Sequence, residues 1–551
     1  MVAYAEIIDL SFTYPDESEK ALRSVSVRLE EGEFVVINGP SGCGKSTLLK
    51  HFKQEVLPVG DREGSIFYQG IAIHELDKVT SAREIGMVFQ NPENQIVMET
   101  VIQEIAFSLE NIGFPSEDIK KKIAELVRFL GIEHMLHQSV HTLSGGQKQL
   151  VNLASVLALQ PKLLLLDEPT AQLDPVAAKE FLELLKRIHE ELGVTIVVVE
   201  HRLDELLPLA ERLIFMEKGT ILYNDSPRSV IVDLWKDAAY RSYIPDIPRL
   251  FLESKSNTVP FSVKEGMKHI NDRLPLHGSA EKKQHHEGKP LIKGTGLTFR
   301  YEMTSETVLS QLDIAVHSGD CMALVGANGS GKSTLLTILA GLHKPRKGKV
   351  VFQNQRIEKW TPQKRYMKIG YVSQQPAYHF TYDEVELELY ERCRQFPELN
   401  PQPLADKLMD DFQLGHIKHR HPMDISEGEK QIFAIILALL SQPELLLLDE
   451  PTKGLDPEKK EQLGCLFQKL QHEGAAIMLA THDIEFAAKY ANRCAMLFDG
   501  EIVSENDPAG FFSSNYFYTT GVNRLVRKKQ PYALTWEDVN MLCQNDQTLR
   551  M

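Results

Sequence analysis

Residues 39–47 read Gly39-Pro40-Ser41-Gly42-Cys43-Gly44-Lys45-Ser46-Thr47, which is the pattern GxxxxGK[ST]. An apolar run from Phe34 to Ile37 precedes this stretch, and a helix-like run follows it. In that context the glycines let backbone N–H groups turn toward a phosphate at a helix N-terminus, where anions are favoured. The lysine of such a loop reaches the β- and γ-phosphates of a nucleotide, and the hydroxyl after it holds Mg²⁺. The stretch therefore predicts a phosphate site in which Lys45 and Ser46 have these roles.

The chain contains this pattern a second time, again after an apolar run, Met322 to Val325. The second copy reads Gly326-Ala327-Asn328-Gly329-Ser330-Gly331-Lys332-Ser333-Thr334. A further stretch, Leu163-Leu-Leu-Leu-Asp-Glu-Pro-Thr170, recurs as Leu445-Leu-Leu-Leu-Asp-Glu-Pro-Thr452. Because order and spacing are nearly kept, the sequence predicts two homologous halves.

Each run of four leucines predicts a buried strand that carries a pair of carboxylates to its polar end. Asp167 and Asp449 suit Mg²⁺, directly or through water. Glu168 and Glu450 suit the polarising of an attacking water, a task that needs a carboxylate within hydrogen-bond reach.

Composition and charge limit the remaining classes. The chain has 551 residues, a formal net charge of -15 and six cysteines without a CxxC pair. The acidic balance argues against a nucleic-acid partner, and scattered cysteines favour a reducing compartment. We expect no signal peptide and no membrane span, because no apolar run reaches the ~18 residues that a span requires. Apolar helical periodicity from Pro175 to Leu192, followed by a β-branched run, predicts alternating α and β elements and a mostly parallel sheet.

The halves meet in a polar stretch, Gly278 to Gly288, which predicts a flexible linker. A fainter echo relates 259–265 to 530–536 and suggests a small C-terminal subdomain in each half. We expect a first domain at 1–230, its C-terminal extension and the linker at 231–289, a second domain at 290–513, and a C-terminal extension at 514–551.

A further motif, Leu143-Ser-Gly-Gly-Gln147, lies shortly before the first run of leucines. Together with the phosphate loops it resembles the signature of the ABC ATPases. The resemblance implies an α/β fold with two tandem P-loop ABC ATPase domains, each with a mostly parallel sheet core, a helical subdomain and a small antiparallel β subdomain. It also implies ATP and Mg²⁺ as cofactors, and ATP hydrolysis coupled to transport.

The same resemblance assigns roles to residues outside the loops. It implies Q-loop glutamines that also serve as metal ligands, switch histidines, D-loops at Leu173-Asp174 and Leu455-Asp456, and aromatic residues that stack on adenine. The glutamines, histidines and aromatic residues are Gln90, Gln374, His201, His482, Tyr14 and Tyr301.

In ABC ATPases two domains face each other head to tail, so the resemblance implies an intramolecular sandwich, which fusion of the halves favours. Each ATP then lies between one phosphate loop and the opposite signature, whose serine and glycine N–H groups complete the cradle. The signature residues are Ser144, Gly145, Gly146, Gln147, Ser426 and Gly428.

The second signature departs from the pattern, because Ile425-Ser-Glu-Gly-Glu429 places Glu427 where the first half has a glycine. A carboxylate about 6 Å from a phosphate charge costs roughly 2–3 kcal/mol per charge at an effective dielectric near 20. We therefore expect ATP on Lys332, which faces Ser144, to turn over faster than ATP on Lys45. The alternative, that the second signature works normally, stays open because both glutamates and both histidines are present.

The segment from Phe89 to Val101, which continues through Glu104 to Asn111, resembles the region after the Q-loop in importers of the energy-coupling factor type. That likeness implies uptake of a vitamin, such as a thiamine precursor, or of a metal ion. Its implied partners are a constant coupling subunit and a substrate-binding subunit in the membrane, with this chain at the cytoplasmic face. Val97, Val101, Ile105 and Leu109 have helical spacing, as in a partner-binding stripe or in plain core.

Two other classes remain as alternatives. Tandem ABC proteins that act on ribosomes typically have a long charged helical linker and a basic character. Fused ATPases of sugar importers usually lose catalytic residues in the second half, whereas this chain keeps Lys332, Asp449 and Glu450.

Overall fold

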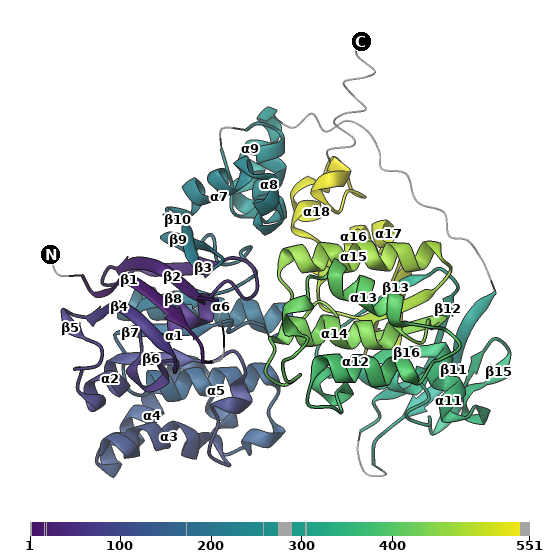
Figure 1. Cartoon of the computed structure of the whole chain (residues 1–551), viewed down its shortest axis with the longest axis horizontal. Coiled ribbons are helices and arrows are strands. Elements are labelled where there is room, and N and C mark those ends of the chain that lie inside the picture. The colour runs from purple at the N-terminus through teal and green to yellow at the C-terminus, as the bar shows by residue number, and fades with distance from the viewer. Residues whose placement is uncertain are drawn as a thin grey trace. The chain divides into compact units, whose positions relative to one another are not determined.

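The computed structural model describes residues 3–15, 17, 19–171, 173–256, 258–273, 289–302 and 306–539. It divides into two compact units, Met1–Pro245 and Asp246–Met551, and each is considered by itself (Figure 1). The predicted linker at 278–288 lies outside the described residues.

A six-stranded, mostly parallel sheet forms the centre of the first unit, with the strand order β10-β9-β3-β8-β7-β6. All neighbours are parallel except β9 and β10. Every residue of β3, β7 and β8 is buried, which explains why these strands are almost continuous apolar runs. The strands are β3 (Phe34–Asn38), β6 (Ile85–Val88), β7 (Leu163–Asp167), β8 (Thr195–Val199), β9 (Arg212–Glu217) and β10 (Thr220–Asp225).

An antiparallel sheet of order β2-β1-β4-β5 accompanies this sheet. Burial alternates along part of β2, as expected of a strand with one face in the core. The strands are β1 (Ala5–Thr13), β2 (Leu22–Leu29), β4 (Asp61–Tyr68) and β5 (Ile71–Ala72).

Three helices, α3 (Val101–Ile112), α4 (Ser116–Leu130) and α5 (Gly145–Leu157), form a helical group with a hydrophobic core of its own, and they lie together in Figure 1. The stripe of α3 belongs to this core, because Val101, Ile105 and Leu109 are fully buried. Val97 alone is exposed. The partner-binding interpretation is therefore wrong for three of the four residues. The other helices are α1 (Lys45–Lys50), α2 (Lys78–Glu84), α6 (Pro175–Leu192) and α7 (Pro227–Lys236).

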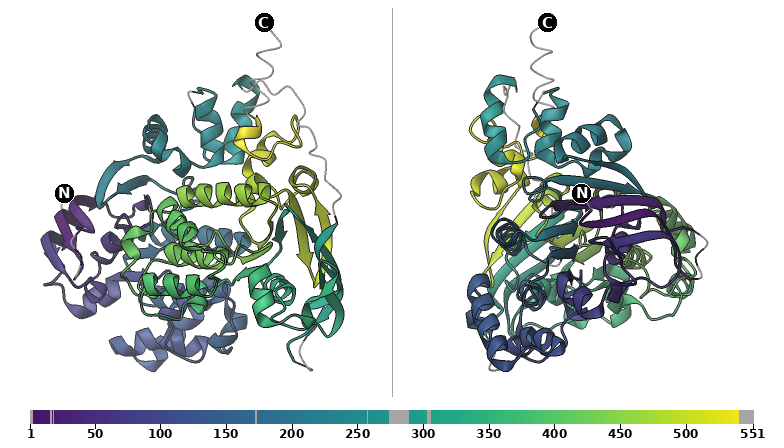
Figure 2. Two further views of the ribbon diagram at one scale, coloured as in Figure 1. Left: turned by 45° about the vertical axis from the view of Figure 1, so that its right-hand side comes forward. Right: turned by 90° about the vertical axis from the view of Figure 1, so that its left-hand side faces the viewer.

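The second unit repeats this plan, which confirms the prediction of two α/β domains with a mostly parallel sheet, a helical part and an antiparallel sheet. Its sheets have the orders β16-β17-β18-β13-β19-β20 and β12-β11-β14-β15. Figure 2 shows both units from two further sides. The strands are β11 (Pro290–Phe299), β12 (Leu309–His317), β13 (Cys321–Val325), β14 (Lys347–Phe352), β15 (Gln355–Arg356), β16 (Ile369–Val372), β17 (Leu445–Asp449), β18 (Ala476–Ala480), β19 (Arg493–Phe498) and β20 (Glu501–Asn506). The helices are α10 (Lys332–Leu339), α11 (Pro362–Lys368), α12 (Val385–Arg394), α13 (Gln402–Asp411), α14 (Glu427–Leu439), α15 (Pro457–His472), α16 (Ile484–Tyr490) and α17 (Pro508–Ser514).

A separate small core joins segments that are far apart in the sequence. Helices α8 (Asp246–Glu253) and α9 (Val263–Arg273) pack against α18 (Gly521–Val526) within the second unit. The unit boundary thus falls inside the segment 231–289, which sequence reasoning assigned to the first half and the linker. The core residues are Leu250, Phe251, Ile270, Val522, Leu525, Val526, Ala533 and Val539.

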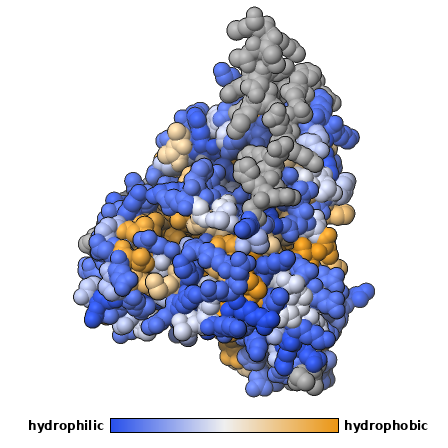
Figure 3. Space-filling view, turned by 90° about the vertical axis from the view of Figure 1, so that its right-hand side faces the viewer, coloured by the Kyte–Doolittle hydropathy of each residue, from blue (hydrophilic) through white to orange (hydrophobic). Residues whose placement is uncertain are grey.

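The surface is mostly polar on the face that Figure 3 shows, with hydrophobic side chains in small groups. None of the helices in the described part of the chain is long and apolar enough to cross a membrane.

Candidate active sites

The first phosphate loop connects β3 to α1, and two of its three glycines, Gly39 and Gly44, lie close to neighbouring backbone. A Cβ at Gly39 would lie 2.2 Å from the carbonyl oxygen of Met216, and one at Gly44 would lie 2.5 Å from that of Ala21. Both residues also have positive φ, 146° and 100°. Glycine is therefore required at both places.

The two loop lysines are anchored in the same way. Lys45 Nζ donates to the carbonyl oxygens of Gly39 and Pro40 at 2.9 and 2.7 Å. Lys332 Nζ donates to the corresponding oxygens of Gly326 and Ala327 at 2.8 and 3.1 Å. Each ammonium group is thus held over the mouth of its own loop, where a phosphate would meet it.

The predicted adenine-stacking residues also lie beside these loops. The Tyr14 hydroxyl is 3.0 Å from Thr47 Oγ1, and the Tyr301 hydroxyl is 2.9 Å from Thr334 Oγ1. The phosphate loop and the candidate aromatic residue of each half therefore meet within one unit.

Serine and aspartate oxygens face each other in both halves, a donor set that fits Mg²⁺. Ser46 Oγ donates to Asp167 Oδ1 at 2.7 Å, and Ser333 hydrogen-bonds to Asp449. Burial, with the neighbouring Glu168, raises the pKa of Asp167 to about 6. Burial likewise raises the pKa of Asp449 to about 6, although the Ser333 bond opposes it.

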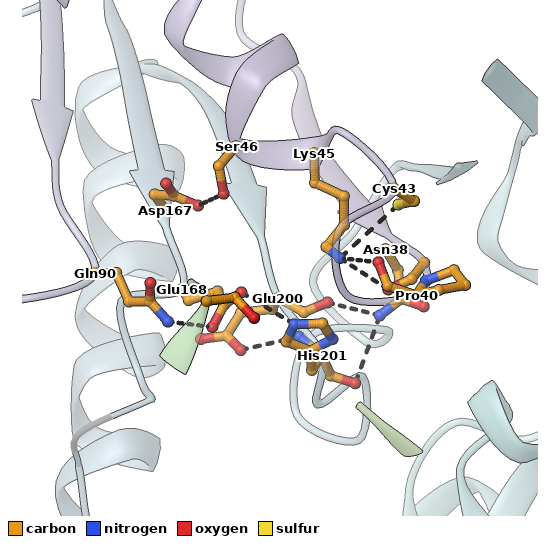
Figure 4. A network of polar contacts seen from close by, with 12 residues as sticks. Asn38, Pro40, Cys43, Lys45, Ser46, Gln90, Asp167, Glu168, Glu200 and His201 are labelled. Carbon is orange, nitrogen blue, oxygen red and sulfur yellow. Dashed lines mark hydrogen bonds and ion pairs between the residues drawn. The ribbon is translucent and has the colours of Figure 1, made fainter. Parts of the chain in front are cut away.

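Glu168 is the centre of a polar network in the first unit (Figure 4). Gln90 Nε2 donates to its Oε2 at 2.7 Å, and His201 Nε2 lies 3.0 Å from its Oε1. Burial alone would raise the pKa of Glu168, but His201, Lys45 and Gln90 together lower it below the usual value. The carboxylate is therefore held ionised and oriented, as a base that polarises water must be.

The second unit has the same residues in a different arrangement. His482 presents Nδ1, not Nε2, to its glutamate, 2.8 Å from Glu450 Oε2. Gln374 is exposed, and within the described residues no hydrogen bond joins it to Glu450. Structure thus brings Glu450 and His482 together but leaves Gln374 apart.

The signature serines cap the helices that follow them. Ser144 and Ser426 form capping boxes with Gln147 and Glu429 at the starts of α5 and α14. The two boxes differ chemically, because Ser426 Oγ donates to Glu429 Oε2 at 2.7 Å.

The departures in the second signature are both partnered. Glu427 is half exposed and pairs with Lys430 at 3.0 Å. His416 Nε2 lies 2.8 Å from Glu429 Oε1. Burial would raise the pKa of Glu429, but the bonds from His416 and Ser426 lower it to about 2. A carboxylate therefore remains at this helix N-terminus.

Comparison with known proteins identifies the family. The family model for the ABC transporter matches residues 22–171 and 309–453. The chain belongs to the ABC transporter family. A Bacillus anthracis protein named as an ABC transporter ATP-binding protein is 56% identical over 99% of both chains. YkoD of Bacillus subtilis, named for HMP/thiamine import, is 33% identical over 97% of both chains.

Among solved structures, cbiO1 from Clostridium perfringens, titled as part of the ABC transporter complex cbiONQ, is similar to this ABC protein. It is 32% identical with a TM-score of 0.39, over 43% of this chain and 94% of that one. By family, this ABC protein is the ATP-binding subunit of a transporter and an ATPase.

Sequence reasoning assigned no role to three buried carboxylates of this ABC protein, although it named Glu104 within the segment after the first Q-loop. Glu200 is a buried carboxylate directly before His201. Glu104 and Glu388 are buried carboxylates in the helices after the Q-loops. The signal in the sequence was a charged residue at an otherwise apolar position. Such a residue is buried only where hydrogen bonds or an opposite charge compensate it, so it predicts a partner.

Proposed function

We propose that this chain is the energy-coupling ATPase of an importer of the energy-coupling factor type. It acts at the cytoplasmic face of the membrane and drives uptake of a vitamin or a metal ion through a constant coupling subunit and a substrate-binding subunit. Similarity to YkoD over nearly the whole chain supports a vitamin of the thiamine-precursor kind.

The observation that supports a membrane partner is that the segment after each Q-loop is firmly held by a buried glutamate. Glu104 Oε2 accepts the backbone N–H groups of Val97 and Met98 at 2.9 and 2.7 Å. Glu388 Oε2 accepts those of Thr381 and Tyr382 at 2.6 and 2.9 Å. Each segment is therefore fixed to the helical part of its unit.

Both fixed segments present apolar or aromatic side chains to solvent. Val97 is 67% exposed in the first unit. In the second unit Tyr382 of the fixed segment is exposed, and so are Tyr378 before it and Leu387 and Tyr390 in α12 after it. Exposed apolar groups on an ordered surface favour a protein partner.

In the proposed reaction ATP with Mg²⁺ supplies the phosphoryl group and the neutralising charge. Lys45 and Lys332 would hold the phosphates, and Ser46, Ser333, Asp167 and Asp449 would hold the metal ion, with Gln90 and Gln374 as further ligands. Glu168 and Glu450 orient and polarise the attacking water, and His201 and His482 orient these glutamates. The two halves form a head-to-tail sandwich, in which Ser144 and Ser426 complete the opposite sites.

A pull-down tests this proposal. The tagged chain is recovered from detergent-solubilised membranes of its native host, and the bound proteins are identified by mass spectrometry. We expect two small membrane proteins with the wild type and their loss with Val97→Glu. Val59→Glu, at another highly exposed valine of the first unit, is the matched control.

Other results would overturn the importer assignment. Ribosomal proteins without a membrane partner would favour the ribosome-acting class. Membrane permeases of a sugar transporter would favour the other alternative, against which the retained pairing of His482 with Glu450 argues.

A further inference from the structure

Glu200 is a buried carboxylate that the proposed reaction does not use. It follows β8, is 3% exposed and lies within the network of Figure 4. Its Oε1 accepts the backbone N–H and the hydroxyl of Thr170 at 2.9 and 2.6 Å. Its Oε2 accepts the backbone N–H of His201 at 3.2 Å. One side chain thus ties the turn after Glu168 to the switch histidine.

The second unit has a threonine in this place. Glu168 N donates to the carbonyl oxygen of Val199, and Glu450 N donates to that of Ala480, so Thr481 corresponds to Glu200. Thr481 is also buried, but its hydroxyl accepts the N–H of Asp483 at 3.0 Å. The tie to the turn is therefore specific to the first half.

The second half has no such carboxylate, and Glu450, its candidate base, accepts the backbone N–H of the switch histidine instead. The backbone N–H of His482 donates to Glu450 Oε2 at 3.3 Å, the same oxygen that meets His482 Nδ1. In the first half Glu200 takes the corresponding N–H, and the two oxygens of Glu168 face the side chains of Gln90 and His201.

We infer that Glu200 is a positioning residue of the first ATP site. Because Glu200 accepts the backbone N–H groups of His201 and Thr170, both carboxylate oxygens of Glu168 remain available to the side chains of Gln90 and His201. The inference rests on the roles proposed above for Glu168 and His201. A carboxylate is required because donors meet both oxygens, whereas glutamine has a single acceptor oxygen.

Protonation should have the same effect as glutamine. Burial raises the pKa of Glu200, the Thr170 bonds oppose this, and the charged groups that face it are Glu168, which raises it, and His201, which lowers it. The protonated acid keeps only part of its acceptor capacity. Activity of the first site should therefore rise with pH as Glu200 ionises, and Glu200→Gln should lack this acid limb.

The test uses the full chain with Glu450→Gln, which leaves hydrolysis to the first half. In that background we expect Glu200→Gln and Glu200→Thr to lower kcat about tenfold, the value of one charge-assisted hydrogen bond. We expect KM for ATP to change less than about threefold and the acid limb to disappear, in a Glu200→Gln chain that is still folded at the assay temperature. Glu205→Gln, at an exposed glutamate nearby, is the control.

A crystal structure of the Glu200→Gln chain gives a readout that does not depend on turnover. We expect His201 Nε2 to move out of hydrogen-bonding distance of Glu168. An unchanged ring with unchanged kcat and pH profile would overturn the inference. Hydrolysis that survives in the Glu168→Gln, Glu450→Gln double variant would instead reject the proposed roles of these glutamates, which is a distinguishable failure.

Discussion

Glu168 and Glu450 have left-handed backbone conformations, with φ of 43° and 53°, directly after a buried strand. Such a conformation is unfavourable for a residue with a Cβ and persists only where surrounding bonds impose it. Here the N–H of each glutamate donates to the adjacent strand, at 2.9 and 2.8 Å. The turn aims both carboxylates at the switch histidines.

Removing these two carboxylates should have unequal effects on ATP hydrolysis. Glu450→Gln should abolish most of it, with a loss of about 100-fold or more, the usual contribution of a general base. Glu168→Gln should cost less than about threefold, because in the proposed head-to-tail sandwich its site would be completed by the signature that carries Glu427 and Glu429. Steady-state phosphate release measures both, and equal losses would contradict the asymmetry.

The pair of His416 and Glu429 should make stability depend on pH. The bond to Glu429 raises the pKa of His416, so its contribution is complete below the unfolded value, about 6.5, and is lost as pH rises through the folded value. His416→Ala should therefore lower the melting temperature more at about pH 6 than at about pH 9.

The control for this experiment is His134→Ala, which precedes the first signature as His416 precedes the second. Gln147 stands there in place of Glu429, so we expect no comparable pH dependence. Thermal unfolding of both variants is measured across the pH range. If the melting temperatures of His416→Ala and His134→Ala changed with pH in parallel, the His416–Glu429 pair would not contribute the predicted pH dependence.

The roles of motif residues could be predicted because each depends on short spacing along the chain. The ring orientation of His201 could not, because it depends on Glu200 and Thr170, which are brought together by neighbouring strands. Thr170 and Glu200 are 30 residues apart in the sequence, so no local motif relates them. A motif therefore identified the histidine but not which nitrogen faces Glu168.

At the scale of elements, the two hydrogen bonds that Glu104 accepts from Val97 and Met98 determine how firmly the segment after the first Q-loop is held. Glu104→Ala leaves the N–H groups of Val97 and Met98 without their acceptor, at a cost of about 1–3 kcal/mol each where they stay buried. We expect faster amide hydrogen exchange at these two residues. Glu110→Ala, at an exposed position of the same helix, should leave exchange unchanged.

The stripe of α3 shows why helical periodicity predicted an element but not its partner. Val101, Ile105 and Leu109 have the spacing of one helix face, and any apolar surface could cover that face. In the folded unit α4 and α5 cover it. Only Val97, which precedes the helix, remains on the outside.

At the scale of the whole molecule, a helix-capping pattern recurs near the segments 259–265 and 530–536, but two residues later than the predicted echo, because Ser262 corresponds to Thr535 and not to Ala533. Ser262 and Glu265 cap one helix start, and Thr535 and Asp538 cap the other. Their surroundings share one hydrophobic core. Sequence could suggest the repeat but not that the two copies pack together, since no local pattern specifies a contact across so long a separation.

A cut in the chain between 273 and 289 should leave its two fragments associated. Helices α8 and α9 stay covalently attached to the first half, and their side chains remain in the core with α18. Size-exclusion chromatography after limited proteolysis measures this. Phe251→Ala, which empties a fully buried position at a cost of about 3–5 kcal/mol, should let the fragments separate.

The shared core of α8, α9 and α18 also has a consequence for how the gene could be split or duplicated. If the reading frame were divided at the linker, the two shorter genes would encode proteins that already carry complementary ends. Each product would expose part of an unfinished hydrophobic core until it met the other, so the pair would be selected as a heterodimer from its first generation. Conversely, duplication of the first half alone would yield a protein without the partner for Phe251.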